Sequence, residues 1–397
     1  MLNKNRTLTI RLQRGPRKFT ILHNFGSGPG NGRIPYGVLV LHKGVFYGTT
    51  TYGGPPYNTP PSDAPFKGNI FRMNMDGSGF AVLHTFAGGD DDGWKPWVGL
   101  AIADDTIYGS TVYGGPHDKS GGVIYALSTN GSDFRVLHAF GNPADGFGGS
   151  TSPTLIGDTL YGMTRWGGNG SGTIYSYDTL SGRYTRLRSF AQDGRDGSYP
   201  LGTLADGKDG FLYGLTWQGG RNAMGTVFRI RPDGTAFGTL HHFSGTSQGK
   251  YPYDSPIIDD SRQLYGTTLG TYGNDPSDLG VIFKYDLANS AYSVLHRFTG
   301  QKGDSGKPNG NIVLSPDGTR LYGTTHGDAV WGGNVSGVLY QMNTDGTGFT
   351  ELQVFDRKIN GDTPMHTPLL VHGALYGMTA YGGAEDCGVV YRYLISP

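Results

Sequence analysis

Cysteine and glutamate are almost absent from this sequence, and each absence excludes a class of structure or chemistry. Cys387 is the only cysteine, so no disulfide can form within the chain and a cysteine framework is excluded. Glutamate occurs only at positions 351 and 385. Glycoside hydrolysis ordinarily uses two carboxyl groups at a fixed separation, and no such pair stands out. We therefore do not expect a standard glycosidase.

Net charge and long apolar runs are also missing. The formal net charge is +0 at pH 7 and charged residues make up 16% of the chain, so we expect no binding to nucleic acid. No apolar run approaches the ~20 residues that span a bilayer. Residues 1–16 lack the apolar stretch of a secretory signal. The protein is either intracellular or secreted with its signal outside this numbering, and the composition favours secretion.

Glycine and tyrosine are abundant instead, with 69 and 25 residues. The tetrapeptide Tyr-Gly-x-Thr, or a close variant, occurs seven times, and its tyrosines are between 52 and 61 residues apart. The seven copies begin at Tyr47, Tyr108, Tyr161, Tyr213, Tyr265, Tyr322 and Tyr376. Seven copies in register indicate a repeat architecture.

Each repeat contains four segments typical of β-strands. The first follows a proline, as in PYGVLVL, and the second is the Tyr-Gly-x-Thr segment. The third alternates apolar and polar residues, as in GTVFRIR, and the fourth ends in Leu-His-x-Phe or a relative. Hairpin signals such as MDGSG separate the third from the fourth. The pattern predicts an all-β, seven-bladed β-propeller with four antiparallel strands per blade.

The two ends of the chain are predicted to close the ring. The last repeat stops after its third strand, GVVYRYL, while the chain begins with an unpaired fourth strand, KFTILHNF. Residues 17–25 should therefore complete blade seven and remove two exposed sheet edges. We expect a single domain over residues 1–397, with a tail at residues 1–16. The blades are expected at residues 33–86, 96–140, 149–190, 199–243, 251–298, 308–355 and 364–395.

The recurring pattern YGTT…GG…G-x-V/I-F/Y…DG(T/S)…LHxF resembles the tandem-repeat family called GloVer. The resemblance extends over nearly the whole chain. It implies a secreted or surface-displayed bacterial or fungal propeller. It does not imply one activity, because a single fold hosts many functions.

Strand order predicts which rim of the propeller carries a site. Turns after the first and third strands share one rim, and turns after the second and fourth strands share the other. The first rim has short hairpins, whereas the second has long, variable loops such as residues 51–68. Binding residues concentrate on variable loops held by a rigid scaffold. We therefore expect a functional funnel on the second rim, close to the axis.

Comparison of the seven copies separates repeated histidines from single ones. The histidines of the Leu-His-x-Phe position are interpreted as packing residues of the outer strand: His23, His84, His138, His241 and His296. Three histidines remain on the second rim. His117 lies in a long loop, His326 follows the second strand of blade six, and His366 begins the first strand of blade seven.

The position after Tyr-Gly-x-Thr provides three single-copy residues. Arg165, Trp217 and His326 occupy it in blades three, four and six, and we expect them to converge on the funnel. A salt bridge to Asp118 or Asp145 is the alternative for Arg165. Packing in the channel is the alternative for Trp217.

Further aromatic residues are weaker candidates for the funnel. Trp97, Tyr253 and Asp254, where first strands begin, are predicted to line it. Trp331 belongs to an insert in blade six that is predicted to fold over it. Trp166 is one of several aromatic residues that recur before Gly-Gly, so packing explains it well; it is also kept as a substrate-binding candidate.

Several common chemistries lack their motifs. There is no nucleotide-binding glycine loop, no HExxH, no Cys/His metal cluster and no nucleophile elbow. The acidic run at Asp90, Asp91 and Asp92 matches no known Ca²⁺ loop, and a solvated loop explains it better. We expect no cofactor.

The residue types in the funnel suit β-elimination on a uronate-containing glycan. Arg165 would neutralise the carboxylate and make the neighbouring carbon acidic, and His117 or His326 would remove the proton. Trp217, Trp331, Tyr253, His366, Trp97 and Trp166 would bind the sugar rings. Propeller-fold polysaccharide lyases are similar in outline. The expected partner is an acidic polysaccharide or oligosaccharide bound by a monomer.

Two other functions remain open. A non-catalytic propeller that binds a glycan or a protein would use the same aromatic and arginine residues. A purely structural surface array would tolerate alanine at every funnel position.

Overall fold

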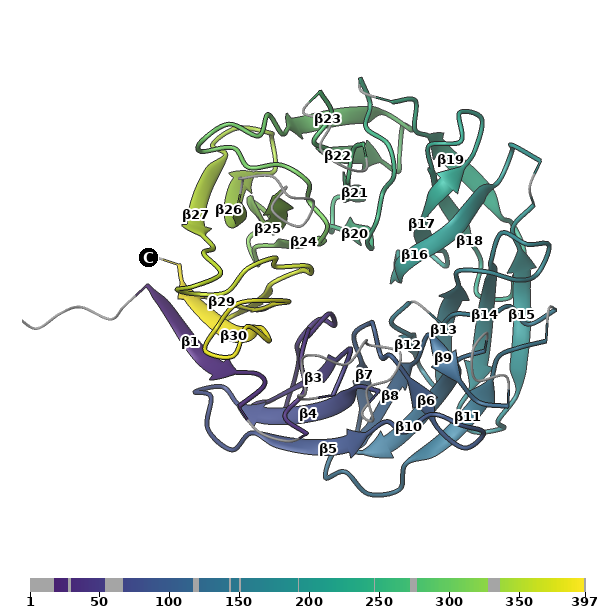
Figure 1. The fold of residues 1–397 in the computed structure, drawn as a ribbon. Helices are drawn as coiled ribbons and strands as arrows, with labels where there is room; N and C mark the ends of the chain where they lie inside the picture. The colour runs from purple at the N-terminus through teal and green to yellow at the C-terminus, as the bar shows by residue number, and fades with distance from the viewer. Residues whose placement is uncertain are drawn as a thin grey trace, which may run out of the picture.

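Seven four-stranded sheets stand around a central axis, like the blades of a propeller (Figure 1). The computed structural model describes residues 18–27, 30–53, 67–116, 121–142, 144–149, 151–191, 193–245, 247–271, 277–327 and 336–395. Neighbouring strands in each sheet are antiparallel. The predicted seven-bladed propeller is therefore confirmed. Within those ranges, no helix is long and apolar enough to cross a membrane.

The first four blades take their strands in chain order. Blade one contains β2 (Val40–His42), β3 (Val45–Thr50), β4 (Asn69–Asn74) and β5 (Ala81–Thr85). Blade two contains β7 (Ala101–Ala103), β8 (Thr106–Ser110), β10 (Val123–Ser128) and β11 (Arg135–Ala139). Blade three contains β12 (Thr154–Ile156), β13 (Thr159–Thr164), β14 (Thr173–Asp178) and β15 (Tyr184–Ser189). Blade four contains β16 (Gly197–Asp206), β17 (Leu212–Gly219), β18 (Thr226–Ile230) and β19 (Gly238–His242).

The remaining blades follow the same order until the ring closes. Blade five contains β20 (Ile257–Ile258), β21 (Gln263–Thr268), β22 (Val281–Asp286) and β23 (Tyr292–Arg297). Blade six contains β24 (Ile312–Leu314), β25 (Arg320–Gly327), β26 (Ser336–Asn343) and β27 (Thr350–Val354). Blade seven contains β28 (Leu369–Val371), β29 (Ala374–Thr379), β30 (Val389–Leu394) and β1 (Phe19–Asn24). A separate pair, β6 (Gly93–Trp94) and β9 (Tyr113–Gly114), lies beside blade two.

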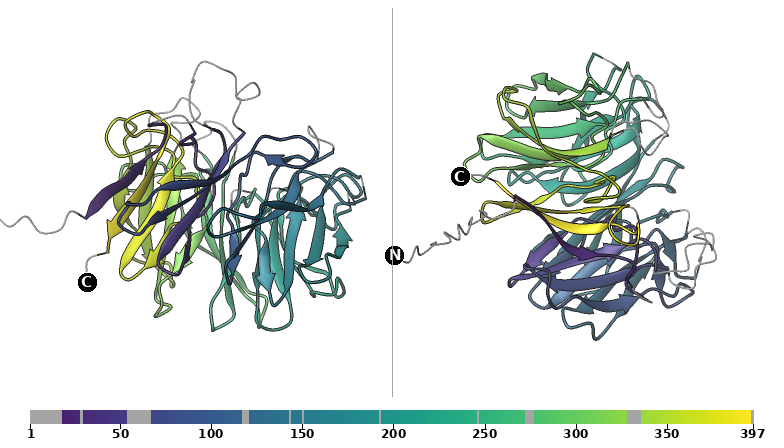
Figure 2. Two further views of the ribbon diagram at one scale, coloured as in Figure 1. Left: turned by 90° about the horizontal axis from the view of Figure 1, so that it is seen from below. Right: turned by 60° about the vertical axis from the view of Figure 1, so that its left-hand side comes forward.

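The N-terminal strand closes the ring as predicted. β1 runs antiparallel to β30, with Phe19 opposite Tyr393 and Asn24 opposite Val389. Figure 2 shows the purple N-terminal strand lying along the yellow C-terminal strands. Phe25, directly after β1, is fully buried. Blade seven is thus built from both ends of the chain.

The glycine of Tyr-Gly-x-Thr lies against an aromatic ring of the third strand. A Cβ on Gly214 would lie 2.3 Å from Cζ of Phe228. The threonine of the motif also has a repeated role, since Oγ1 of Thr268 accepts a hydrogen bond from the backbone N–H of Val281 at 3.2 Å. The motif therefore recurs because blade packing requires it.

Histidines of the Leu-His-x-Phe position join neighbouring blades. The His84 ring stacks on Phe134 of blade two with 3.8 Å between ring centres. Its Nε2 lies 3.2 Å from Oδ1 of Asp92, where the next first strand approaches. The other members of the set repeat this stacking on an aromatic ring of the next blade. Their packing role agrees with the sequence interpretation.

A residue with left-handed backbone conformation lies at or shortly before the start of each first strand. The seven residues are Ile34, Lys95, Gly148, Tyr199, Tyr251, Lys307 and Thr363, with φ between 54° and 72°. Six of their backbone N–H groups donate to the preceding blade; for example, the N–H of Lys95 donates to the carbonyl of Lys67 at 2.8 Å. The N–H of Thr363 donates instead to Oδ1 of Asp362. In six of the seven blades a proline follows. These joints place the side chains described next.

Candidate functional site

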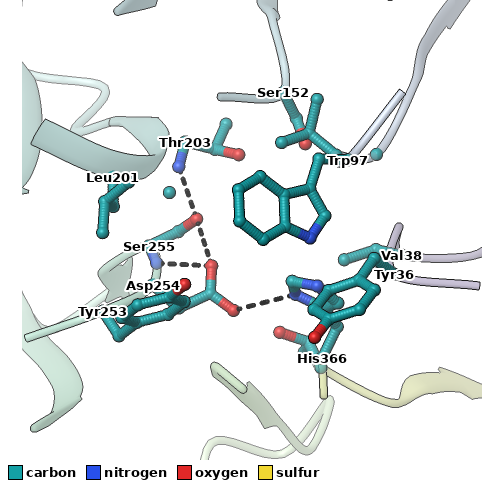
Figure 3. Close-up of a pocket in the computed structure, with 14 residues that line it drawn as sticks. Tyr36, Val38, Trp97, Ser152, Leu201, Thr203, Tyr253, Asp254, Ser255 and His366 are labelled. Carbon is teal, nitrogen blue, oxygen red and sulfur yellow. Dashed lines mark hydrogen bonds and ion pairs between the residues drawn. The ribbon is translucent and has the colours of Figure 1, made fainter. Parts of the chain in front are cut away.

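A hollow opens where the first strands begin, at the mouth of the central channel (Figure 3). The space between its walls, including the open mouth, is about 620 Å³. Six of the seven blades contribute to its lining. The main side chains are Tyr36, Trp97, Ser152, Thr203, Tyr253, Asp254, Ser255 and His366. The three first-strand candidates from the sequence, Trp97, Tyr253 and His366, therefore lie together.

Aromatic rings form one wall of this hollow. The Tyr36 ring packs edge-on against Trp97, with 5.5 Å between ring centres, and against His366 at 5.9 Å. Figure 3 shows Tyr36 beside His366 with Trp97 next to both. Aromatic faces of this kind bind the apolar faces of ligands.

Asp254 lies next to His366 in the hollow (Figure 3). Its Oδ2 is 3.7 Å from Nδ1 of His366. The side chains of Asp254 and His366 are 11% and 20% exposed, respectively. The sequence predicted that Asp254 lines the funnel, but not that it approaches His366. Its proximity to His366 depends on the packing of blades five and seven.

Arg165 stacks between two tryptophans on the same rim. Its guanidinium carbon lies 4.9 Å from the centre of the Trp166 ring and 5.2 Å from that of Trp217. Asp145 is instead 3.7 Å from Nε2 of His138, and Asp118 lies outside the described residues. In the described part of the chain Arg165 has no ion pair. Arg165 and Trp217 therefore contact each other, but neither lines the hollow, and their convergence on the funnel stays a prediction.

Lys95 joins this group and was missed in the sequence. Its Nζ lies 4.6 Å from the centre of the Trp97 ring and 5.5 Å from that of Tyr113. Burial, and secondly the positive charge of Arg165, lowers the pKa of Lys95. We call Lys95, Arg165, Trp97, Trp166 and Trp217 the cation–aromatic rim. The available signal was a single lysine directly before Pro96-Trp97.

Trp217 is surrounded by further tyrosines. Its ring centre lies 6.4 Å from that of Tyr199 and 6.0 Å from that of Tyr251. Both tyrosines are left-handed residues at the starts of first strands. The cation–aromatic rim therefore continues from blade three across blade four towards blade five.

His326 does not line the hollow. It is 3% exposed, and its backbone N–H donates to the carbonyl of Lys307 at 3.1 Å. β25 continues past His326 to Gly327, which pairs with Ser336, so His326 remains within the sheet. His117 and Trp331 lie outside the described residues.

The family of the protein follows from its repeats. A model of the Gloeobacter/Verrucomicrobia repeat matches residues 61–275 and 249–396. The chain belongs to the Gloeobacter/Verrucomicrobia repeat family. No curated protein matches this family member significantly.

Solved structures resemble this repeat protein in fold. An oligogalacturonate lyase from Vibrio parahaemolyticus matches with a TM-score of 0.57 and 11% identity, over 95% of this chain and 93% of that chain. An oligogalacturonate lyase in complex with manganese matches with 0.57 and 13%, over the same shares. A puromycin-hydrolyzing peptidase from Mycobacterium tuberculosis matches with 0.55 and 13%, over 94% of this chain but only 55% of that chain. At such identities the likeness shows the fold alone.

A metal site in a protein requires several donor side chains close together. Among the residues that the structure describes, no group of three or more His, Cys, Asp or Glu side chains is placed to hold one. Asp254 and His366 are only two such donors. Asp92, from the acidic run, accepts the N–H of Ala87 at 2.8 Å and contacts His84. Its carboxylate therefore serves the joint between blades one and two.

Proposed function

We propose that this repeat protein binds uronate-containing glycans in the hollow and cleaves them by β-elimination. The observation that carries the proposal is positive charge without a counter-ion. Neither Lys95 nor Arg165 has an ion pair within the described residues, and burial, followed by the charge of Arg165, lowers the pKa of Lys95. Two such cations are stabilised when an anion binds between them. The chain as a whole is neutral, so this charge is a local feature.

Carboxylate binding by these cations supports elimination. Neutralising the carboxylate of a uronate makes the proton on the adjacent carbon easier to remove, and a guanidinium does so with directed hydrogen bonds. Trp97 and Trp217 offer faces for sugar rings. The fold that this chain shares with two oligogalacturonate lyase structures is compatible with such a substrate.

The first test is the ultraviolet absorbance of the unsaturated uronate product on a panel of acidic polysaccharides. We expect absorbance to grow with the wild-type protein. In Arg165→Ala, kcat/KM should fall ~100-fold or more, because a charge-stabilising donor is lost. The matched control is Arg186→Ala, an exposed arginine on β15 of the same blade, which should behave as wild type. Equal rates in Arg165→Ala and wild type would move the site elsewhere.

Glycan binding without cleavage is the second candidate. The burial of His326 favours it, because one of the two histidines expected to remove the proton does not line the hollow. A binding protein would retain acidic glycans on an array, lose them in Arg165→Ala, and produce no absorbance with any substrate.

We also propose that the protein is a secreted monomer. Among the described residues, the exposed large hydrophobic side chains are Val82, Leu180, Val354 and Ile359. Val82 and Leu180 lie on blades one and three, and Val354 and Ile359 lie at and just after the end of blade six. So few apolar residues, divided over three places, do not make an interface. Fractionation of the culture medium and light scattering of the purified protein test the two parts of this proposal.

A further inference from the structure

One position of the first strand differs between blades in a way that the scaffold does not require. The residue six places after each left-handed residue pairs with the tyrosine of Tyr-Gly-x-Thr, as Ile257 does with Tyr265 and Leu369 with Tyr376. This pairing aligns the blades. Three places after the left-handed residue, the seven copies are Gly37, Val98, Thr151, Gly202, Asp254, Gly310 and His366. Only blades five and seven carry ionisable groups there.

Those two ionisable groups meet across blade six. Oδ2 of Asp254 and Nδ1 of His366 are 3.7 Å apart. The equivalent residue of the intervening blade is Gly310, and a Cβ there would lie 2.7 Å from the carbonyl carbon of His366. Glycine in blade six thus leaves room for the backbone of blade seven. The pair is thus a departure of blades five and seven from the repeat, while blade six keeps the glycine that blades one and four also have.

The carboxylate of Asp254 is held by several donors. Its Oδ1 accepts the N–H of Ser255 at 2.7 Å and the Ser255 hydroxyl at 3.0 Å. Its Oδ2 accepts the N–H of Asn311 from blade six at 2.9 Å. Oγ of Ser255 in turn accepts the N–H of Thr203 from blade four at 2.6 Å. This network spans three blades and fixes the direction of the carboxylate towards His366.

His366 is fixed through its backbone, and its side chain, which is 20% exposed, lines the hollow. Its carbonyl accepts the Thr324 hydroxyl at 3.1 Å. Nε2 is shielded from solvent and has no hydrogen-bond partner within the described residues. A carboxylate on the Nδ1 side favours the tautomer with the proton on Nδ1, which leaves Nε2 as the basic nitrogen.

We infer that His366, positioned by Asp254, transfers the proton in the β-elimination; this inference rests on the proposed function. Nε2 takes the proton from the carbon beside the carboxylate. The electron pair of that C–H bond forms the carbon–carbon double bond, and the C–O bond on the next carbon breaks with its electron pair leaving on the oxygen. The departing oxygen takes the proton from the imidazolium, so His366 returns to its starting form. Asp254 stabilises the transient imidazolium.

The test compares two substitutions in the hollow with a matched histidine control. In His366→Gln we expect kcat to fall ~10²–10⁴-fold, as for loss of a general base, with KM and glycan retention on a column nearly unchanged. His372→Gln should cleave as wild type, because His372 is exposed on the short hairpin of the same blade at the other rim. Thermal melting of every variant controls for folding.

Chemical rescue separates proton transfer from a structural role. Imidazole added to His366→Ala should restore part of the rate, which a packing residue would not allow. Asp254→Asn should lower kcat by less than His366→Gln and should gain nothing from imidazole, because its own histidine is still present. A wild-type rate in His366→Gln, with Arg165→Ala inactive, would overturn this inference and leave the proposed function standing. Absence of cleavage by the wild-type protein on every uronate-containing glycan would overturn both.

Discussion

Among the described residues, His241 is the member of the Leu-His-x-Phe set that has neither an acidic partner, as three of the set have, nor an amide partner, as His23 has in Asn31. His84 and His296 lie 3.2 Å and 2.8 Å from Asp92 and Asp304, eight residues further along the chain. The corresponding residue for His241 is Gly249. Its ring stacks on Tyr292 with 4.0 Å between centres. Burial, and secondly the charge of His242, lowers the pKa of His241 to about 4.

This depressed pKa predicts a loss of stability in mild acid. The ordinary pKa of histidine is near 6.5, so between about pH 6.5 and about pH 4 the unfolded chain binds a proton that the folded protein does not. The stability is complete above that window and falls as the pH drops through it. In His241→Gln, the difference in unfolding free energy between pH 7 and pH 4.5 should be smaller than in wild type. Urea titrations at both pH values measure it.

Glutamine is a suitable replacement because Gln353 occupies the equivalent position in blade six. His372→Gln serves as the control, since His372 is exposed on a hairpin. The prediction fails if wild type and His241→Gln lose the same free energy between the two pH values.

At this scale, the sequence located some site residues and could not locate others. Arg165 and Trp217 differ from the other copies at their position, so comparison of the repeats was enough. Lys95 was missed because its contact with Trp97 follows from a left-handed backbone that no local pattern announces. Asp254 was predicted to line the funnel, but its contact with His366 could not be predicted because His366 lies two blades away. His326 was expected in the funnel because the sequence does not show that β25 extends past it. That extension depends on the pairing of Gly327 with Ser336.

The blade, as an element, depends on close approach between its second and third strands. The third-strand aromatic ring lies directly over the glycine of Tyr-Gly-x-Thr. Any Cβ at this position pushes that ring out of a fully buried site, which costs ~1–3 kcal/mol or more.

We therefore expect Gly214→Ala to lower the unfolding free energy by at least ~1–3 kcal/mol, because its Cβ would meet Phe228. Gly238→Ala, in the same blade, is the matched control: a Cβ there has no atom within 4 Å. Urea unfolding followed by tyrosine and tryptophan fluorescence measures both. Similar stability of the two variants would show that the ring moves aside without cost.

Strand order could be predicted because each strand is bounded by local turn signals and alternating residues. The β6–β9 pair could not, because it joins the start of one first strand to the residues after Tyr-Gly-x-Thr. Equivalent bridges occur between Arg33 and Tyr52, between Phe147 and Trp166, and between Asp362 and Tyr381. They give the aromatic residues before Gly-Gly, Trp166 among them, a packing role alongside the rim contact with Arg165.

For the whole molecule, β1 is the strand that completes the ring. Deletion of residues 1–25 should leave β30 as an exposed edge and remove Phe25 from the core, so we expect aggregation. Deletion of residues 1–17 alone keeps β1 and should leave a monomer. Size-exclusion chromatography with light scattering distinguishes the two. A soluble, monomeric protein without residues 1–25 would mean that the ring does not need its closing strand.

Recovery by a peptide provides the complementary control. A synthetic peptide of residues 18–27, added during refolding of the longer deletion, should pair with β30 and restore the monomer. A peptide with the same composition in scrambled order should not.

Ring closure also has a consequence for synthesis of the chain. Among the strands of the propeller, β1 is synthesised before all the others and its partner β30 after all the others. At roughly 5–20 residues per second, the two are separated by on the order of half a minute. During that time the apolar side of β1 has no sheet to join, and blade one faces a gap where blade seven will form. β1, which completes the propeller, is therefore the strand that remains unpaired for the longest time during synthesis.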